Sequence, residues 1–474
     1  MRQDSTKDNK KSLLERVFRL KENGTSIKTE VVGGLTTFIT MAYALMVIPN
    51  VLKISGMNAQ GIKGDGATVF NVLNDPYVGS AFTAMCIVSA LGTLIMALYA
   101  NLPFALAPGI GLTAFFTYSV CLTLGYTWQQ GVAAIFISGL VFIIITITSI
   151  RERIVEALPQ NIKTAMTSGI GLFITLIGLK SGGIIVSNPD TLVSFGSFTE
   201  PKPLLTLIGI AIMGILVARK VKGAMLIAIL LTTLIGIPMG VTDFSNIQIL
   251  SMPKSIVPTF MQMDFKGLLN QNGAGVIGAI TSVIMVVLTF SLVDLFDTIG
   301  TLVGTANKAN MILPDGKIKN MKKALVADSI STIFSGIFGL TTTSTYVESA
   351  AGIAAGARTG LSSTVVSILF ILSLFMGGVV GIVPTEATAP ALVIVGILML
   401  ESIKEVDFSD FTEALPAFFT IVIMPFSYSI ANGIAAGIIF YPLMKLFTKR
   451  YKEVHPIIYV LAVLFIIRFI MLPQ

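Results

Sequence analysis

Apolar segments recur along the chain from residue 31 almost to the C-terminus, and short polar stretches separate them. Most are about 20 residues long, the length that a helix needs to cross a bilayer core of roughly 30 Å. The pattern predicts an all-α polytopic membrane protein with about 14 transmembrane segments. The first seven are 31–50, 78–99, 103–122, 131–149, 162–181, 204–218 and 223–240. The second seven are 275–303, 322–340, 341–357, 361–381, 384–400, 413–427 and 430–446.

The composition supports this fold class and excludes a soluble one. Hydrophobic residues make up 54% of the chain and charged residues only 12%, against roughly 25% charged residues in a soluble domain. Cys86 and Cys121 both fall within apolar segments, and His455 is the single histidine. Two isolated thiols and one imidazole make neither a disulfide framework nor a metal site. We therefore expect no cofactor, no metal and no enzyme activity.

Basic residues predict which way the chain faces. Lys and Arg collect in cytoplasmic loops, so the net charge of +7 is interpreted as topology rather than as a surface for nucleic acid. Residues 1–30 carry eight of them and form a predicted cytoplasmic arm, in which 13–21 could be a short amphipathic helix on the lipid bilayer. Alternating spans in the cell membrane then place 25 basic residues inside and six outside. Arg468 lies in 456–472, which is a surface helix or an extra span.

The two sets of spans have the same shape: a long first span, an interrupted third element and a late pair of short spans. Because each set has an odd number of spans, the second has inverted topology. We expect a 7+7 inverted repeat with repeats at 31–240 and 275–446, an external loop at 241–274 and a C-terminal segment at 447–474. This architecture is typical of secondary transporters, whose substrate site lies near the bilayer midplane.

Segments 3 and 10 each predict a short extended piece followed by a half-helix. They are Phe104–Phe116, where Pro108 would occupy the first helical turn, and Leu340–Gly352, where Thr345 and Glu348 have the spacing of a capping box. Extended backbone inside a membrane must be buried in protein or line a cavity. Two half-helix N-termini at mid-depth would offer N–H donors to a ligand. The alternative is that Pro and Gly only kink ordinary spans.

Four carboxylates lie within apolar sequence: Asp294, Asp297, Asp328 and Glu348. A charge there costs roughly 2.5 to 3.5 kcal/mol on insertion scales and usually marks a substrate or ion path. Asp294 and Asp297 are three residues apart and share one helix face, so the site is expected to hold a proton. Each has a simpler alternative: Glu348 only caps its helix, Asp297 only hydrogen-bonds the second half-helix, and Asp328 pairs near the cytoplasmic surface beyond Lys322.

With these segments combined, the sequence resembles the nucleobase:cation symporter family with the uracil-permease fold, in its AzgA-like purine permease branch. The resemblance covers about 28–450, and its most specific strings are Gly34–Tyr43, Pro103–Phe116, Asp294–Thr301 and Tyr346–Gly352. It implies a core domain at about 31–150 and 275–381 that carries the site. It also implies a gate domain at about 162–240 and 384–446 that often dimerises. Members import purine bases such as hypoxanthine, guanine and adenine with protons.

The same resemblance implies the roles of individual carboxylates. Asp294 and Glu348 match the substrate-binding and proton-coupling positions, and Asp297 is a polar anchor beside them that also belongs to the proton-coupling set. Relatives usually have Asn where this chain has Thr113, which leaves the preferred purine open because Asn offers a donor and an acceptor.

The chemistry of a purine agrees with these assignments. Its flat ring needs a stacking neighbour, carboxylates that accept from its N–H groups and backbone N–H groups that donate to its ring nitrogens. Phe115, Phe116 and Tyr346 could stack on the base, although each could equally pack the interior. The backbone at Ala107 and Gly109 is expected to line the site.

Other functions remain open from the sequence. A carrier of the same fold could move another nucleobase, uracil or xanthine, or an inorganic anion, although intramembrane carboxylates would repel an anion. An intramembrane aspartyl protease needs two Asp residues on separate helices, whereas Asp294 and Asp297 share one. A channel would show no accumulation of substrate.

Overall fold

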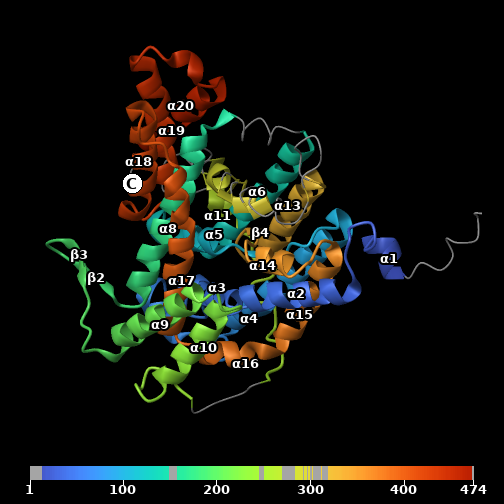
Figure 1. Cartoon of the computed structure of the whole chain (residues 1–474). Coiled ribbons are helices and arrows are strands. Elements are labelled where there is room, and N and C mark those ends of the chain that lie inside the picture. The colour runs from blue at the N-terminus through green and yellow to red at the C-terminus, as the bar shows by residue number, and fades with distance from the viewer. Residues whose placement is uncertain are drawn as a thin grey trace, which may run out of the picture.

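The computed structural model describes residues 13–148, 157–244, 250–269, 283–284, 286–291, 293–295, 297–298, 301–302, 311 and 319–471. Within them, eight helices are long and apolar enough to cross a membrane, and five shorter apolar helices accompany them. Helices make up almost all of the regular structure, as Figure 1 shows. The predicted all-α membrane fold is confirmed.

The elements of the first half follow the predicted spans closely. They are α1 (Leu13–Phe18), α2 (Ile27–Met41), α3 (Ala44–Leu52), η2 (Gly64–Val69), α4 (Pro76–Ile95), η3 (Met96–Ala100), β1 (Leu106–Pro108), α5 (Ile110–Ala114), η4 (Phe115–Thr123), α6 (Trp128–Ile147), α8 (Gln160–Ser181), β2 (Ile185–Asn188), β3 (Leu192–Phe195), α9 (Pro201–Ala218) and α10 (Ala224–Gly236).

The second half also consists mostly of helices. It contains α11 (Phe265–Leu269), α13 (Met321–Phe338), β4 (Thr343–Thr345), α14 (Ser349–Ala354), α15 (Gly360–Ser373), η5 (Leu374–Met376), α16 (Gly377–Ile382), α17 (Thr385–Leu400), η6 (Glu401–Glu405), α18 (Phe411–Phe426), α19 (Ile430–Phe447), η7 (Tyr451–Glu453) and α20 (Pro456–Met471). The eighth predicted span, 275–303, lies partly outside the described residues, and those described between 283 and 302 are helical.

Polar side chains set the ends of several spans. Asp75 accepts hydrogen bonds from the first-turn N–H groups of α4, which begins at Pro76. Thr127 and Gln130 form a capping box at the start of α6. Glu30 on α2 is fully buried and accepts from the backbone N–H groups of Arg358, Thr359 and Ser362 at the start of α15. This carboxylate therefore fixes the first span against the eleventh.

The long helices pack in two groups, visible in Figure 1. In the first group, α15 packs on α2 and α4, and α13 packs on α6. In the second group, α17 packs on α8 and α9, and α18 packs on α8 and α19. The groups contain the spans that the sequence assigns to a core and a gate.

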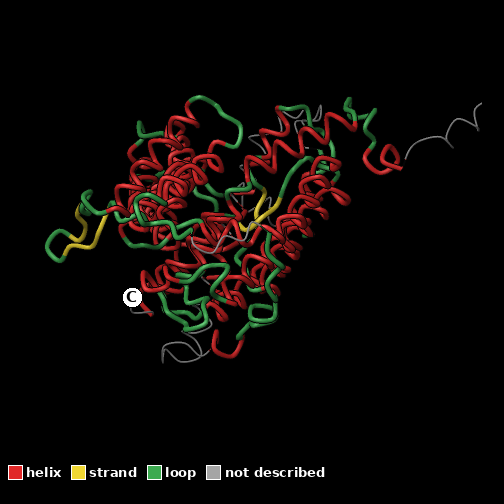
Figure 2. The backbone as a smooth tube through the Cα atoms, turned by 90° about the horizontal axis from the view of Figure 1, so that it is seen from below, coloured by secondary structure: helices red, strands yellow, loops and turns green. Residues whose placement is uncertain are grey.

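Two strand pairs interrupt the helices, and they lie in different surroundings. Figure 2 shows one pair among the helices and the other projecting from the helical body. The inner pair is β1 with β4, antiparallel, with Leu106 opposite Thr345 and Pro108 opposite Thr343. All six residues are buried. The extended pieces predicted in segments 3 and 10 are therefore confirmed, and they pair with each other.

Three local predictions need correction or refinement. Pro108 ends β1, and α5 begins at Ile110 after the N-cap Gly109, so Pro108 is not in the first helical turn. The amphipathic helix of the arm ends at Phe18, and Phe18 packs on Leu361 of α15. α20 packs into the main core through Ile458, Ala462 and Phe465. Whether α20 lies on the membrane or crosses it stays a prediction.

Candidate functional site

The starts of the two half-helices meet around the β1–β4 pair. The Gly109 N–H donates to the Thr342 carbonyl oxygen at 3.1 Å, and the Tyr346 hydroxyl donates to the Pro108 carbonyl oxygen at 2.6 Å. A Cβ at Gly109 would lie 2.8 Å from the Ser344 Oγ, closer than real Cβ contacts allow. A side chain at Gly109 would therefore displace the Ser344 hydroxyl from its present position.

Glu348 stands at the start of the second half-helix. It is the N-cap residue of α14, yet no side-chain capping bond forms, and Thr345 belongs to β4. The predicted capping box is therefore wrong, because strand pairing takes Thr345 out of the helix. The Glu348 carboxylate instead accepts from the Tyr43 hydroxyl at 2.6 Å. Glu348 is half-buried, directly after the exposed Val347.

Asp294 and Asp297 both lie in the helical eighth span. Asp294 is fully buried and Asp297 is half-buried. The Ser344 hydroxyl of β4 donates to the Asp297 carboxylate. Asp297 therefore does bond the segment that leads into the second half-helix, and its carboxylate also lies within electrostatic range of Glu348.

Asp328 lies on α13 and is fully buried, so the prediction that it pairs near the cytoplasmic surface is wrong. The Thr298 hydroxyl donates to Asp328 Oδ2 at 3.2 Å, and the Thr345 N–H points to the same hydroxyl at 3.5 Å. Lys322 instead donates to the Ile147 carbonyl oxygen. Asp328 supports the end of β4 through Thr298.

The structure places the remaining predicted residues around the same strand pair. Ala107 is opposite Ser344 in the register, and Tyr346 is buried directly after β4. The Thr113 hydroxyl lies 2.8 Å from that of Thr341 and donates to the Gly109 carbonyl oxygen at 2.8 Å, so it also joins the two segments. Their contact with substrate stays a prediction.

The two aromatic candidates on the first half-helix differ. Phe115 is fully buried and meets Phe290 of the eighth span edge to face, with ring centroids 4.8 Å apart. Phe116 packs against Gly131 of α6. Phe115 therefore stays a candidate for stacking on a base, whereas Phe116 packs helix against helix.

Tyr43, Thr40 and Ser344 were missed in the sequence reasoning. The Thr40 hydroxyl points to the Glu348 carbonyl oxygen at 3.4 Å, one helical turn before Tyr43. Tyr43 ends one of the family strings, and a hydroxyl in an apolar span could have signalled its role. Its partner lies 305 positions away, so the contact itself needed the fold.

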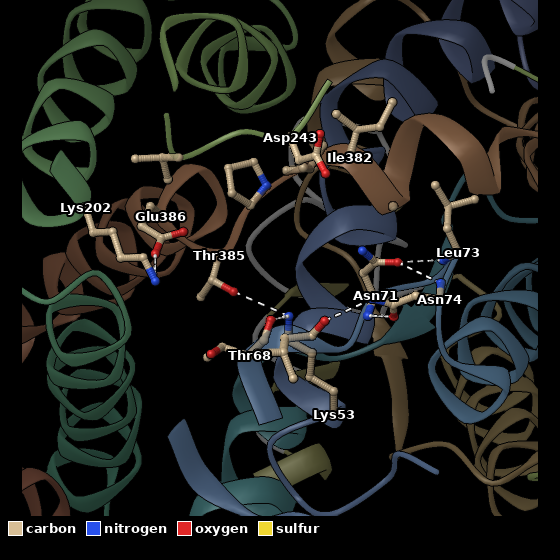
Figure 3. A pocket seen from close by; sticks show the side chains of 15 residues that line it. Lys53, Thr68, Asn71, Leu73, Asn74, Lys202, Asp243, Ile382, Thr385 and Glu386 are labelled. Atoms are coloured by element: carbon tan, nitrogen blue, oxygen red, sulfur yellow. Dashed lines mark hydrogen bonds and ion pairs between the residues drawn. The ribbon is translucent and has the colours of Figure 1, made fainter. Parts of the chain in front are cut away.

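A separate cleft of about 460 Å³ opens between the two helix groups, shown in Figure 3. Its lining includes Lys53, Lys202 and Glu386 and none of the predicted site residues. Lys53 Nζ donates to the carbonyl oxygens of Thr68 and Phe70 and, at 3.5 Å, to the Thr385 hydroxyl, while Lys202 pairs with Glu386 at 3.6 Å. Burial lowers the pKa of Lys53 to about 8, against the opposing effect of Glu386.

In the described part of the chain, no cluster of His, Cys, Asp or Glu side chains could hold a metal ion.

Comparison with known proteins places the chain among permeases. The family described as the Permease family matches residues 28–436. The adenine permease AdeP of Escherichia coli (strain K12) is 40% identical over 99% of this chain and 98% of its own length. The guanine/hypoxanthine permease PbuG of Bacillus subtilis (strain 168) is 40% identical over 96% and 99%. The solved transmembrane domain of a cyanobacterium bicarbonate transporter, BicA, shares the fold, with a TM-score of 0.59 at 16% identity over 86% of this chain and 97% of that one.

Proposed function

This chain belongs to the permease family of nucleobase:cation symporters, and from that premise we propose that it imports purine nucleobases by proton symport with alternating access. The relatives support the substrate class, since one takes adenine and another takes guanine and hypoxanthine at the same 40% identity. Overall identity therefore does not choose between these bases.

The carrying observation is Glu348 at the junction of the two half-helices, with Asp297 in electrostatic range. A carboxylate accepts from the N–H edge of a purine through charge-assisted hydrogen bonds. The first-turn N–H groups of the half-helix that begins at Ile110 have no partner within that helix, and we propose that the ring nitrogens of the base accept from them. We assign Phe115 and Tyr346, which are both buried, as the rings that stack on the base. We assign Asp294, fully buried on the eighth span of the same repeat as Glu348, as a second titratable group of the site.

Proton coupling follows from these carboxylates, because a carboxylate inside a membrane is stabilised when it takes up a proton. One proton moving through about 100 mV supplies roughly 2.3 kcal/mol. That supports about 50-fold accumulation of a neutral base, at about 1.4 kcal/mol per tenfold.

Alternating access is supported by how the two helix groups meet. We assign the first group as the core and the second as a gate domain that could also form a homodimer. Three hydrogen bonds within the described residues join the groups: Lys53 to Thr385, Tyr118 to Ser181, and Ser119 to the Tyr428 carbonyl oxygen. Each involves at least one hydroxyl, so they can break and reform as the core moves past the gate.

The test is uptake of radiolabelled hypoxanthine, guanine and adenine into proteoliposomes with an imposed proton gradient. Unlabelled purines and pyrimidines serve as competitors. We expect purines to compete and accumulation to stop when the gradient is dissipated. Uptake that follows a sodium gradient at constant pH and potential would contradict the proposal that the proton is the coupling ion. Transport of bicarbonate or sulfate without purine uptake would contradict the substrate class.

A further inference from the structure

Tyr43 lies at the junction of the two helices that make up the first span. α2 ends at Met41 and α3 begins at Ala44, with Ala42 and Tyr43 between them. Tyr43 is 1% exposed, so its hydroxyl has no access to water. A buried phenol needs a hydrogen-bond partner, and this one has Glu348 Oε1 at 2.6 Å.

The first span contacts Glu348 at two points, but the Thr40 hydroxyl has closer acceptors in the carbonyl oxygens of Thr36, at 2.9 Å, and Thr37, at 2.8 Å. Tyr43 bonds the carboxylate, and Thr40, one turn earlier on the same face, points its hydroxyl to the main-chain oxygen of the same residue at 3.4 Å. The shorter contact is charge-assisted when the carboxylate is ionised, which makes it the stronger of the two. Because Tyr43 engages Oε1, the lone pairs of Oε2 remain for another donor.

We infer that Tyr43 is a positioning residue for Glu348: it fixes one carboxylate oxygen so that the other is aimed at the substrate, and it favours the ionised carboxylate. The inference rests on the proposed function, because it assigns Tyr43 a part in binding and proton release at that site. When Glu348 takes up a proton, the bond from Tyr43 loses its charge assistance. Protonation of Glu348 therefore weakens its contact with the first span directly.

The alternative is that Tyr43 only fills space, since its ring belongs to the main buried cluster. Tyr43→Phe separates the two roles because it keeps the ring and removes the hydroxyl. Tyr126→Phe is the matched control: Tyr126 is also 1% exposed and is not part of the proposed site. Thr40→Val tests the weaker contact at nearly constant size.

The experiment measures purine uptake by full-length protein in proteoliposomes, as initial rate against substrate concentration from pH 5 to pH 9. For Tyr43→Phe we expect the KM to rise on the order of 10-fold, the loss typical of a hydrogen bond to a charged group. The pH profile of uptake should differ from that of wild type, because Glu348 loses its bond from Tyr43 while Asp297 and Tyr346 still face it. Thr40→Val should change KM less than threefold, and Tyr126→Phe should match wild type.

A double variant makes the result specific to the pair. Binding of labelled purine to purified protein is compared for Glu348→Gln with and without Tyr43→Phe. If Tyr43 acts through Glu348, the second change adds little to the first. Wild-type KM and pH profile in Tyr43→Phe, or fully additive losses, would overturn the inference. If wild type binds and transports no purine, the proposed function fails first, so the two failures are distinguishable.

Discussion

Tyr346 and Pro108 are 238 positions apart, yet the Tyr346 hydroxyl donates to the Pro108 carbonyl oxygen at 2.6 Å. Each residue stands where an extended piece ends and a half-helix follows. The Tyr346 side chain reaches back across the β1–β4 ladder, from just beyond the Leu106–Thr345 pair to Pro108 in the pair at the other end. The two half-helix starts are therefore held as one unit, and a ligand between them meets a single pre-formed surface.

Removing this hydroxyl should loosen the unit without removing its ring. Tyr346→Phe leaves the buried Pro108 carbonyl oxygen unpaired, which costs about 1 to 3 kcal/mol of stability. We expect a lower melting temperature in detergent and reduced, but not abolished, purine uptake, because the ring face remains. Tyr99→Phe, on a half-exposed ring, is the control and should leave both unchanged. An unchanged melting temperature in Tyr346→Phe would show that the bond contributes nothing to stability.

The two carboxylates should be separable by neutral isosteres. Asp294→Asn and Glu348→Gln keep the shape and a carbonyl acceptor but remove the titratable proton and add an NH2 donor that confronts a substrate N–H. A lost charge-assisted hydrogen bond costs about 1.5 to 3 kcal/mol, or about 10- to 150-fold in affinity. We expect severe loss of proton-driven uptake from either change.

If Glu348 mainly couples the proton, the Glu348→Gln variant should still exchange purine weakly across the membrane. The control is Glu405→Gln, an exposed carboxylate on η6. Near-normal proton-driven uptake by both site variants, at equal surface expression, would refute the proposed site. If the protein were an anion carrier, Asp294→Asn would instead leave anion transport unchanged or increase it.

The fold was largely predictable because membrane spans can be recognised in a sequence as long apolar segments. The first span, predicted at 31–50, is α2 and α3 over 27–52, with the difference set by polar caps such as Ser26. The half-helices were predictable because Pro, Gly and Thr break the pattern at the same place in each half. The pairing of Leu106 with Thr345 was not, since it joins segments far apart in sequence.

The candidate site was predictable in its charges and not in their partners. Asp294 and Glu348 stand out because a carboxylate in apolar sequence is costly. The capping-box spacing at Thr345 misled because tertiary strand pairing overrides a local signal. Asp328 misled in the same way: its place in the sequence beyond Lys322 did not reveal that the Thr298 hydroxyl, on another span, donates to it.

Thr113 should influence which purine is preferred. The family resemblance implies Asn at this position, and Thr113→Asn is expected to shift the ranking of hypoxanthine, guanine and adenine as competitors without abolishing transport. The Thr113 hydroxyl also bonds Thr341, so Thr113→Val is needed as a control that removes the bond at constant size. If both variants lose stability alike and neither changes the ranking, Thr113 only joins the two segments.

Topology can be checked with single cysteines and an impermeant thiol reagent. The native Cys86 and Cys121 are buried, so they should give little background in intact cells. Asp65→Cys, in the loop 51–77 that follows the first span and is therefore predicted to be external, should be modified from outside. Lys222→Cys, in the predicted cytoplasmic loop, should react only after permeabilisation. Reaction of Lys222→Cys from outside would overturn the orientation.

The last prediction concerns an ion-pair cluster at the predicted cytoplasmic end of α18 and α19. Lys445 is fully buried and lies 2.8 Å from carboxylate oxygens of both Glu413 and Glu453. Arg450 bonds Glu453 and Asp410. Hydrogen bonds from Arg450 and then Lys445 lower the pKa of Glu453 to about 2, and Arg450 holds the pKa of Asp410 below its usual range.

A carboxyl with a lowered pKa stabilises the folded state above its ordinary pKa, and that stability is lost as pH falls toward the lowered value. The melting temperature of purified protein should therefore fall between about pH 4.5 and pH 2. Glu453→Gln should lower the melting temperature at pH 7 and flatten this acid dependence, because its amide cannot ionise. Glu405→Gln should leave both the melting temperature at pH 7 and the slope unchanged. An acid slope identical in Glu453→Gln and wild type would show that other carboxylates govern acid unfolding.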